Sequence, residues 1–247
     1  MIKRIAPEAD LIDITHGIAP QHVLQGALVL ANTLPYMPVG VHLAVVDPGV
    51  GGQRRPLALR GADGQLYVGP DNGLLAVAAD RLGGVSEAVE IASREYMLTP
   101  VSPTFHGRDI FSPAAAHLAR GVSLSDLGPG LDPAALVRLD LPAPDARPGR
   151  IRATVLDIDR FGNVQLNLTS ADLERAGIAQ GDTVEVETLN ERYFALVART
   201  FVDVRPGDIV LYEDAYRNIA LAINRGNAAD ILATRVGQPI ELMRVTG

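Results

Sequence analysis

The most constraining feature of this 247-residue sequence is a change in hydrophobic periodicity on either side of a proline-rich segment, residues 128–149. Before this segment, short apolar runs alternate with stretches that repeat apolar residues at helical spacing. After it, apolar and polar residues mostly alternate, as in strands with one buried face. The segment contains five prolines, which is typical of an interdomain linker. We therefore predict two domains, residues 1–127 and 150–247, joined by 128–149.

The first domain is predicted to be a layered α/β structure with a mainly parallel sheet. Apolar runs predict strands at residues 11–14, 41–46 and 89–91, a hairpin over 57–69, and helices from about 20 to 34, 74 to 83 and 108 to 120. The second domain has short alternating runs separated by Gly, Asn and Asp, with one helical stretch at 170–176. It is therefore predicted to be a smaller, all-β domain, most simply a β-barrel.

Composition excludes several classes of function. The chain has 22 Lys and Arg against 29 Asp and Glu, a net charge of −7, which disfavours nucleic acid as a partner. Without Cys there is no disulfide, Cys-ligated zinc or thiol nucleophile. No apolar run is long enough to span a membrane, and the first ten residues do not resemble a signal peptide, so we expect a soluble cytoplasmic protein. The spacing of His and acidic residues matches no metal motif, and we expect no metal site.

A glycine-rich loop follows the predicted strand at 41–46. Asp47 ends this strand in VVDPGVGGQRR, and the loop runs on to Arg54. Ligands of open α/β sheets bind outside the carboxyl ends of strands, so Asp47 is well placed for binding or catalysis. A purely structural turn explains the same spacing about equally well. A nucleotide phosphate loop is disfavoured because no Lys-Ser/Thr pair follows the glycines.

His106 lies at the start of a predicted helix in TFHGRDIFSPAAAH. The positive end of the helix dipole disfavours a protonated imidazole, and a neutral His can accept a proton or orient a water molecule. The alternative is a His whose ring nitrogens bind backbone groups. Asp109, in the same segment, is expected to stabilise the helix.

Two further segments combine polar residues with turn signals. In IDRFGNVQLN, Asp159, Phe161 and Asn163 offer a carboxylate, an aromatic face and a carboxamide, which would suit an amine joined to a flat ring system. A β-turn has the same composition. In YVGPDNGLL, Asp71 and Asn72 are explained equally well by a helix cap.

Taken in order, six segments resemble the S-adenosyl-L-methionine (SAM) hydroxide adenosyltransferases, relatives of the SAM-dependent fluorinase and chlorinase. They are IAPEADLIDITHGI, VVDPGVGGQRRPL, YVGPDNGLL, TFHGRDIFSPAAAHLA, IDRFGNVQLN and NIALAINRGNAA, and they extend over nearly the whole chain. The resemblance implies an N-terminal α/β domain and a C-terminal β-barrel. It also implies a homotrimer that binds SAM, as substrate and without a cofactor, between one subunit's first domain and its neighbour's second.

The resemblance further implies hydrolysis of SAM to adenosine and methionine. Hydrolytic members carry an Asp, an Arg seven residues later and a His, which match Asp47, Arg54 and His106. Halogenating members depart from this trio. Asp159 would bind the methionine ammonium, and further substrate contacts are implied for Phe161, Asn163, Tyr212, Asp214, Tyr216, Ile223 and Asn224. The stretch LYEDAYRN departs from relatives, where a Ser-Gly pair is common.

Several alternatives stay open. Either Asp47 or His106 could take the proton of the attacking water. The protein could be a halogenase, a SAM- or adenosine-binding protein without turnover, or a structural trimer. Family members begin with a strand and an Asp-containing turn that binds ribose, and this sequence begins after that element. We expect a start downstream of the true one rather than loss of the ribose-binding Asp, since removing a sheet strand would expose unpaired backbone groups.

Overall fold

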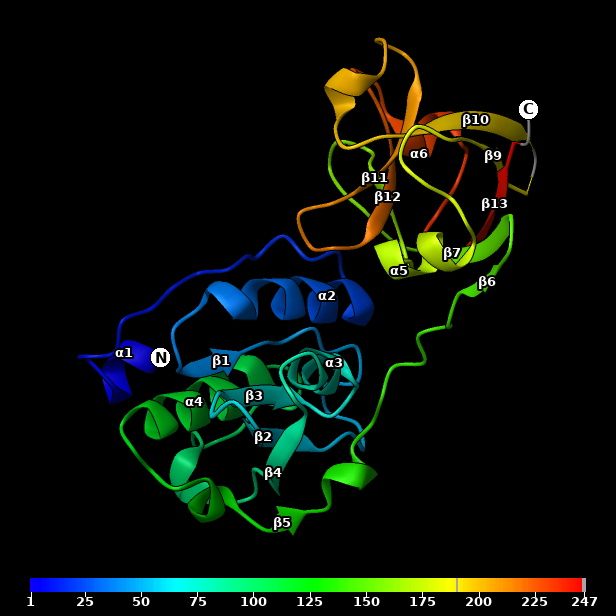
Figure 1. The fold of residues 1–247 in the computed structure, drawn as a ribbon. Helices are drawn as coiled ribbons and strands as arrows, with labels where there is room; N and C mark the ends of the chain where they lie inside the picture. The colour runs from blue at the N-terminus through cyan, green and yellow to red at the C-terminus, as the bar shows by residue number, and fades with distance from the viewer. Residues whose placement is uncertain (190, 246–247) are drawn as a thin grey trace. The chain divides into compact units, whose positions relative to one another are not determined.

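A computed structural model describes residues 1–189 and 191–245 (Figure 1). The chain divides into two compact units, Met1–Leu139 and Asp140–Gly247. The predicted class, an α/β unit followed by a β-barrel unit, is confirmed.

The first unit is built on a five-stranded sheet in the order β1-β3-β2-β4-β5. Its strands are β1 (Val41–Leu43), β2 (Pro56–Gly61), β3 (Leu66–Pro70), β4 (Val85–Glu90) and β5 (Gly130–Leu131). Its helices are α1 (Ile2–Ile5), α2 (Val23–Thr33), α3 (Leu74–Asp80) and α4 (Ser112–Ala119), and a π-helical turn, Gly107–Phe111, leads directly into α4.

Helices cover both faces of this sheet and make three layers. On one face, α2 and α3 pack their small and branched side chains against Leu57, Leu59 and Tyr67. On the other, α4 packs against Ala58 and Val68. Alternate residues of β2 and β3 therefore enter two different cores, which explains why these strands are almost continuously apolar.

The prediction of a mainly parallel sheet is wrong. Only β1–β3 is a parallel pair in the described part of this unit, and the other three ladders are antiparallel. The reason is the predicted hairpin, which the structure confirms as β2–β3. Its tight turn reverses β2, which then lies between β3 and β4 and pairs antiparallel with both.

Residues 11–14 form no strand, contrary to the prediction. Leu11, Ile12 and Ile14 are exposed, and the segment is assigned to no ladder of the described chain. A short apolar run predicts a strand only where a neighbouring strand offers free backbone groups, and that condition cannot be derived from the run itself.

The proline-rich segment carries more structure than a linker. Residues 130–139 belong to the first unit, where β5 extends the sheet and Leu136 is buried. At its other end, β6 (Asp145–Arg147) pairs with the first long strand of the second unit. The division between the units falls after Leu139, inside the predicted linker.

The second unit is a closed barrel. Seven strands follow the order β13-β9-β10-β11-β12-β8-β7, and pairing of β13 with β7 closes the ring. Their bounds are β7 (Arg150–Ile158), β8 (Val164–Leu166), β9 (Thr183–Glu187), β10 (Arg192–Val197), β11 (Ile209–Glu213), β12 (Ile219–Ile223) and β13 (Pro239–Arg244). The predicted helix is α5 (Ser170–Arg175), and a short α6 (Ala228–Ile231) was not predicted.

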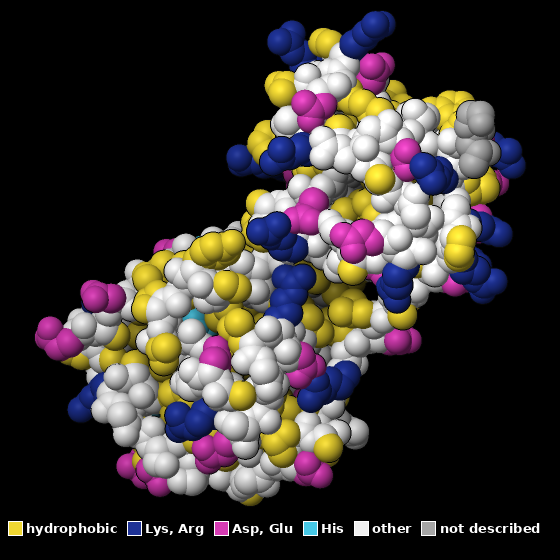
Figure 2. Space-filling model, viewed as in Figure 1, with side chains coloured by type: hydrophobic (Ala, Val, Ile, Leu, Met, Phe, Trp, Pro, Cys, Tyr) yellow, Lys and Arg dark blue, Asp and Glu magenta, His cyan; other side chains and the backbone are white. Residues whose placement is uncertain are grey.

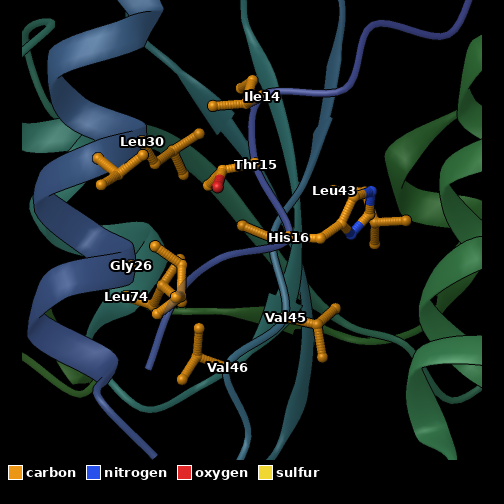
Figure 3. Close-up of a pocket in the computed structure, with 12 residues that line it drawn as sticks. Ile14, Thr15, His16, Gly26, Leu30, Leu43, Val45, Val46 and Leu74 are labelled. Carbon is orange, nitrogen blue, oxygen red and sulfur yellow. The ribbon is translucent and has the colours of Figure 1, made fainter. Parts of the chain in front are cut away.

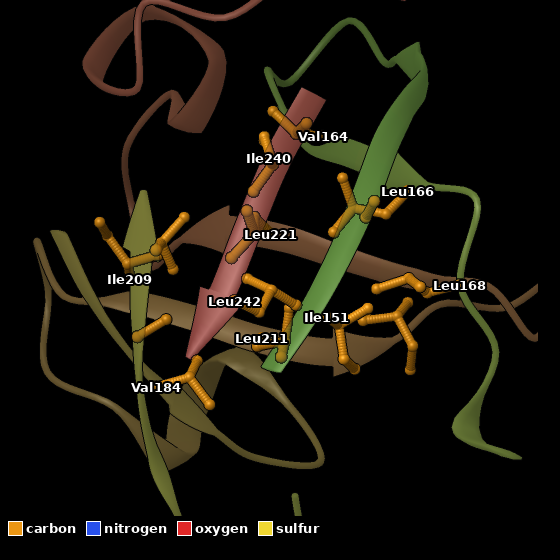
Figure 4. Close-up of a cluster of buried hydrophobic side chains, with 14 of the residues drawn as sticks. Ile151, Val164, Leu166, Leu168, Val184, Ile209, Leu211, Leu221, Ile240 and Leu242 are labelled. Carbon is orange, nitrogen blue, oxygen red and sulfur yellow. The ribbon is translucent and has the colours of Figure 1, made fainter. Parts of the chain in front are cut away.

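Alternation of side chains fills the barrel. Ile151 of β7, Leu221 of β12 and Leu242 of β13 are fully buried and point into one cluster (Figure 4). Their neighbours Arg150 and Arg152 point outward and are exposed. The two-residue period of the sequence therefore sets which face of each strand is inside.

Charges of both signs are mixed on one face of the protein. Lys and Arg side chains are interspersed with Asp and Glu on the face drawn in Figure 2. Among the described residues, no helix has both the length and the apolar character needed to cross a bilayer.

Candidate functional site

Asp47 and Arg54 form the centre of the candidate site. They lie at the two ends of the loop formed by residues 47–54. This loop follows the β1 segment, by which we mean β1 together with residues 44–46. Arg54 donates from Nε to both Asp47 oxygens at 3.0 Å and from Nη2 to Oδ2 at 2.5 Å. The Asp47 side chain is 6% exposed and that of Arg54 10%, so the pair is largely shielded from water. A shielded bidentate pair of this kind is geometrically specific.

His106 completes the group from a distant part of the chain. Arg54 Nη2 lies 2.8 Å from His106 Nδ1. A guanidinium can only donate, so Nδ1 accepts and the proton of the neutral imidazole is on Nε2. Burial, and after it the positive charge of Arg54, lower the pKa of His106 below its usual 6.5. The structure thus brings the three predicted residues together and favours the predicted neutral imidazole.

A contact with an aromatic ring helps to hold the Arg54 guanidinium in place. The guanidinium of Arg54 lies over the ring of the fully buried Phe111, 5.1 Å from its centroid. Phe111 ends the π-helical turn that begins directly after His106. Sequence analysis missed Phe111 because its position inside a predicted amphipathic helix indicates only a core residue.

Asp109 fixes the loop before His106. Its carboxylate accepts from the backbone N–H of Ser102 at 2.8 Å and from Arg108 Nε at 2.6 Å. The hydrogen bond from Arg108 is the main cause that lowers the pKa of Asp109. Asp109 is fully buried and does not contact Asp47 or Arg54 through a hydrogen bond in the described network. These bonds join Asp109 to the preceding loop and to Arg108, whereas the sequence predicted that it would stabilise the helix.

An apolar pocket lies on the α2 side of residues 43–46. Figure 3 shows it between α2, residues 43–46 and the segment 14–16, with Leu30, Val46 and Leu74 on its walls. Its volume is about 240 Å³. Val46 lines this pocket and directly precedes Asp47, whereas none of the three trio residues lines it.

Three of the predicted residues of the second unit, Asp159, Phe161 and Asn163, lie in the turn at 159–163. Asp159 Oδ1 accepts from the backbone N–H of Phe161 and of Asn163, and Oδ2 accepts from Asn163 Nδ2 at 2.8 Å. These bonds form the β-turn that sequence analysis gave as the alternative. Phe161 is 62% exposed, and the Arg160 guanidinium lies over its ring, 4.9 Å from the centroid.

Tyr212 and Asp214 are electrostatic neighbours of this turn. Burial raises the pKa of Tyr212 to about 12, with smaller contributions from the charges of Asp214 and Asp159. Gln165, which was not predicted, donates from Nε2 to Asp214 at 2.6 Å. Asp159, Tyr212 and Asp214 therefore share one region of the barrel surface.

Of the remaining predicted residues, Tyr216 contacts this group through its backbone, and Ile223 and Asn224 make their contacts elsewhere. Tyr216 is 48% exposed in the turn after β11, where its backbone N–H binds Asp214. Ile223 packs in the barrel core, and Asn224 donates its amide to the Val204 carbonyl at 2.8 Å. The structure does not bring the Asn224 amide to the 159–163 turn.

The described residues include no group of three or more His, Asp or Glu arranged to hold a metal ion. The trio itself contains one carboxylate and one imidazole, and the guanidinium occupies the space between them.

Comparison with known proteins identifies the family. The signature of the SAM hydroxide adenosyltransferase N-terminal domain matches residues 1–128, and that of the C-terminal domain matches 153–241. The chain belongs to the SAM hydroxide adenosyltransferase family. It is an enzyme of that family.

Relatives of this chain include hydrolases and fluorinases. The (R)-S-adenosyl-L-methionine hydrolase of Salinispora tropica is 46% identical over 246 residues, which are 100% of this chain and 90% of the relative. The fluorinase of an Actinoplanes species is 30% identical, with 89% and 83% covered. A crystal structure of an uncharacterized conserved protein from Thermotoga maritima superposes with a TM-score of 0.91 at 36% identity, covering 98% of this chain and 92% of that one.

Proposed function

We propose that this chain hydrolyses S-adenosyl-L-methionine to adenosine and L-methionine, using water and no cofactor. The observation that carries the proposal is the convergence of Asp47 and His106 on one guanidinium, that of Arg54. Close relatives named (R)-S-adenosyl-L-methionine hydrolase support the substrate.

The chemistry needs an activated nucleophile and little else. The oxygen of water attacks C5′ of SAM in line with the C5′–S bond. A C–O bond forms while the C5′–S bond breaks, and its electron pair goes to sulfur, which leaves as the neutral thioether of methionine. No acid is needed to protonate this leaving group. Holding the water in line with the bond that breaks can supply several kcal/mol of the barrier reduction.

The hydrogen bonds within the trio favour one assignment of the proton. Because His106 Nδ1 accepts from Arg54, the neutral ring presents Nε2–H, which can donate to the water oxygen but cannot take its proton. Asp47 retains carboxylate lone pairs and is then the acceptor of that proton. Arg54 stabilises the carboxylate and the developing hydroxide charge.

The second unit is proposed to bind the substrate. Asp159 would receive the methionine ammonium, and the exposed Phe161 ring and the Asn163 amide would face the adenosine moiety. Tyr212, Asp214, Tyr216, Ile223 and Asn224 are proposed as further binding residues. We also propose a cytoplasmic homotrimer in which one protomer supplies the trio and its neighbour supplies these residues.

Substitution of the trio tests the function. Asp47→Asn and His106→Ala are expected to lower kcat for adenosine release about 100-fold or more. His117→Ala is the matched control, because His117 lies on the helix that follows His106 and contacts Tyr96 instead. Rates near wild type in both trio variants would contradict the proposal.

Halogenation is the competing activity, since fluorinases are among the relatives. Product analysis with SAM in the presence of chloride or fluoride separates the two. We expect adenosine, and 5′-halo-5′-deoxyadenosine as the main product would replace hydrolysis by halogenation.

A further inference from the structure

The loop that carries Asp47 and Arg54 crosses over the end of a central strand. In the sheet order β1-β3-β2, the chain leaves β1, bridges the carboxyl end of β3 and enters β2 at Pro56. Neighbouring strands lie about 4.8 Å apart, so the bridge spans two strand spacings, about 10 Å. We call the two residues that flank the 47–54 loop, Val46 and Arg55, its stems. The residues directly after β3 therefore lie between these two stems.

Those residues are Asp71 and Asn72, and each binds one stem. Asn72 Nδ2 donates to the Val46 carbonyl at 2.7 Å, one residue before Asp47. The backbone N–H of Asp71 donates to the Arg55 carbonyl at 2.9 Å, one residue after Arg54. Asp47 and Arg54, whose side chains must meet, are therefore each next to a stem residue that is hydrogen-bonded to the segment after β3.

Ion pairing strengthens the second attachment. Asp71 is 5% exposed and accepts from Arg55 Nε at 2.8 Å and also from its Nη2. This pairing keeps Arg55 on Asp71, so that Arg54 alone faces Asp47. The other Asp71 oxygen accepts from the backbone N–H of Val137, which fixes Asp71 itself.

The expected helix cap does not account for these contacts, because the N-cap of α3 is Gly73 and no described side chain caps the helix. Asn72 Oδ1 accepts from the Leu74 N–H at 3.3 Å, which is a local turn bond that uses only the oxygen of the amide. The nitrogen is directed to a different element, the end of the β1 segment. An aspartate could accept the same bond from Leu74 but could not donate to a carbonyl.

We propose that Asp71 and Asn72 are positioning residues that set the spacing of Asp47 and Arg54 by fixing the two stems of their loop. This rests on the proposed function, because the trio is its target. Neither residue touches the reacting atoms. Loss of a stem bond moves Asp47 relative to the water it aligns, and misplacement by about 1 Å costs up to about 100-fold in rate.

Asn72→Asp is the sharpest test, because it retains the shape and the oxygen that accepts from Leu74 while removing the donor to Val46. We expect kcat to fall at least 10-fold with KM changed less than about threefold, at a temperature where the variant is folded by circular dichroism. Asn72→Ser, whose shorter side chain can still accept from the Leu74 N–H, is expected to behave alike. Asn32→Ala is the matched control, as Asn32 is a buried amide of the same unit that binds Arg81. It is expected to lower the melting temperature and leave kcat within twofold.

The outcomes separate this proposal from the one it rests on. Unchanged kcat in the folded Asn72 variants, with inactive Asp47→Asn, overturns the positioning role alone. A rise in KM with constant kcat also overturns it, because it indicates binding. If neither Asn72 variant folds, the bond serves the unit as a whole, and the proposal is equally wrong. Full activity in Asp47→Asn contradicts the proposed function instead.

Discussion

Arg54 is the residue at which the chemistry of the first unit converges. Its planar guanidinium offers donors in fixed directions, and the structure uses them for a carboxylate and an imidazole at once. A lysine ammonium is a point charge without this fork and could not orient both partners. The buried ring of Phe111 beneath the guanidinium restricts its movement further.

The pH dependence of the reaction is expected to report the state of His106. Burial and the charge of Arg54 lower its pKa, so the ring is neutral at pH 7 and remains neutral at pH values somewhat below 6.5. If the neutral ring is required, kcat/KM stays constant as pH falls to 6.5 and decreases only at lower pH. A profile of kcat/KM from pH 5 to 9 measures this. A decrease in kcat/KM that is already centred above pH 6.5 would contradict the assignment of His106 as a neutral donor.

The same shift has a defined effect on stability. A depressed folded-state pKa means that the unfolded chain binds the proton more readily. The contribution to the free energy of unfolding is therefore present above pH 6.5 and is lost as pH falls through the folded-state pKa.

At the scale of elements, the site depends on the approach of two loops. Gly51, at the tip of the 47–54 loop, has φ +76°, and a Cβ there would lie 2.4 Å from the Pro103 carbonyl oxygen. Pro103 belongs to the loop that carries His106. Gly51→Ala should push the loops apart and separate Arg54 from His106, lowering kcat by about 10-fold or more.

Gly64→Ala separates this effect from backbone strain. Gly64 has φ +87° in the β2–β3 turn, and a Cβ added there would have no atom within 4 Å. Gly64→Ala should lose about 1 kcal/mol of unfolding free energy, measured by urea denaturation, and Gly51→Ala should lose more because of its added clash. Only Gly51→Ala should lose activity, and equal kcat values in the two variants would contradict the role of the loop contact.

Local sequence patterns predicted most helices and strands, but they failed where long-range strand pairing determines the structure. The helices α2, α3, α4 and α5 and the β2–β3 hairpin were predictable, since periodicity and turn residues are local signals. Strand direction was not, because the position of β2 between β3 and β4 depends on long-range contacts. For the same reason residues 11–14 were predicted as a strand although they are exposed.

The trio was predictable as a set only through the family resemblance. Asp47 and His106 are separated by 59 residues, and no local spacing relates them. What the sequence could not indicate is how they are held. The contacts of Phe111, Asp71 and Asn72 with the loop depend on sheet order, and each residue has an ordinary structural explanation in its own segment.

At the scale of the whole molecule, the proposed trimer predicts complementation between inactive chains. His106→Ala impairs the first unit, and Asp159→Asn impairs the second while retaining the oxygen that accepts from the 159–163 turn. If each site combines the first unit of one protomer with the second unit of its neighbour, a site in a mixed trimer can receive both intact units. Random 1:1 assembly gives about one intact site in four.

We therefore expect the co-expressed pair to recover about 25% of wild-type adenosine release, where each variant alone is nearly inactive. The control pair His106→Ala with Asp47→Asn should recover nothing, because both changes lie in the first unit and no protomer supplies an intact trio. Light scattering establishes whether the mixed assembly is trimeric. Absence of recovery in a verified mixed trimer would mean that each site is built within one chain, since only a site shared between neighbours can combine intact units from different variants.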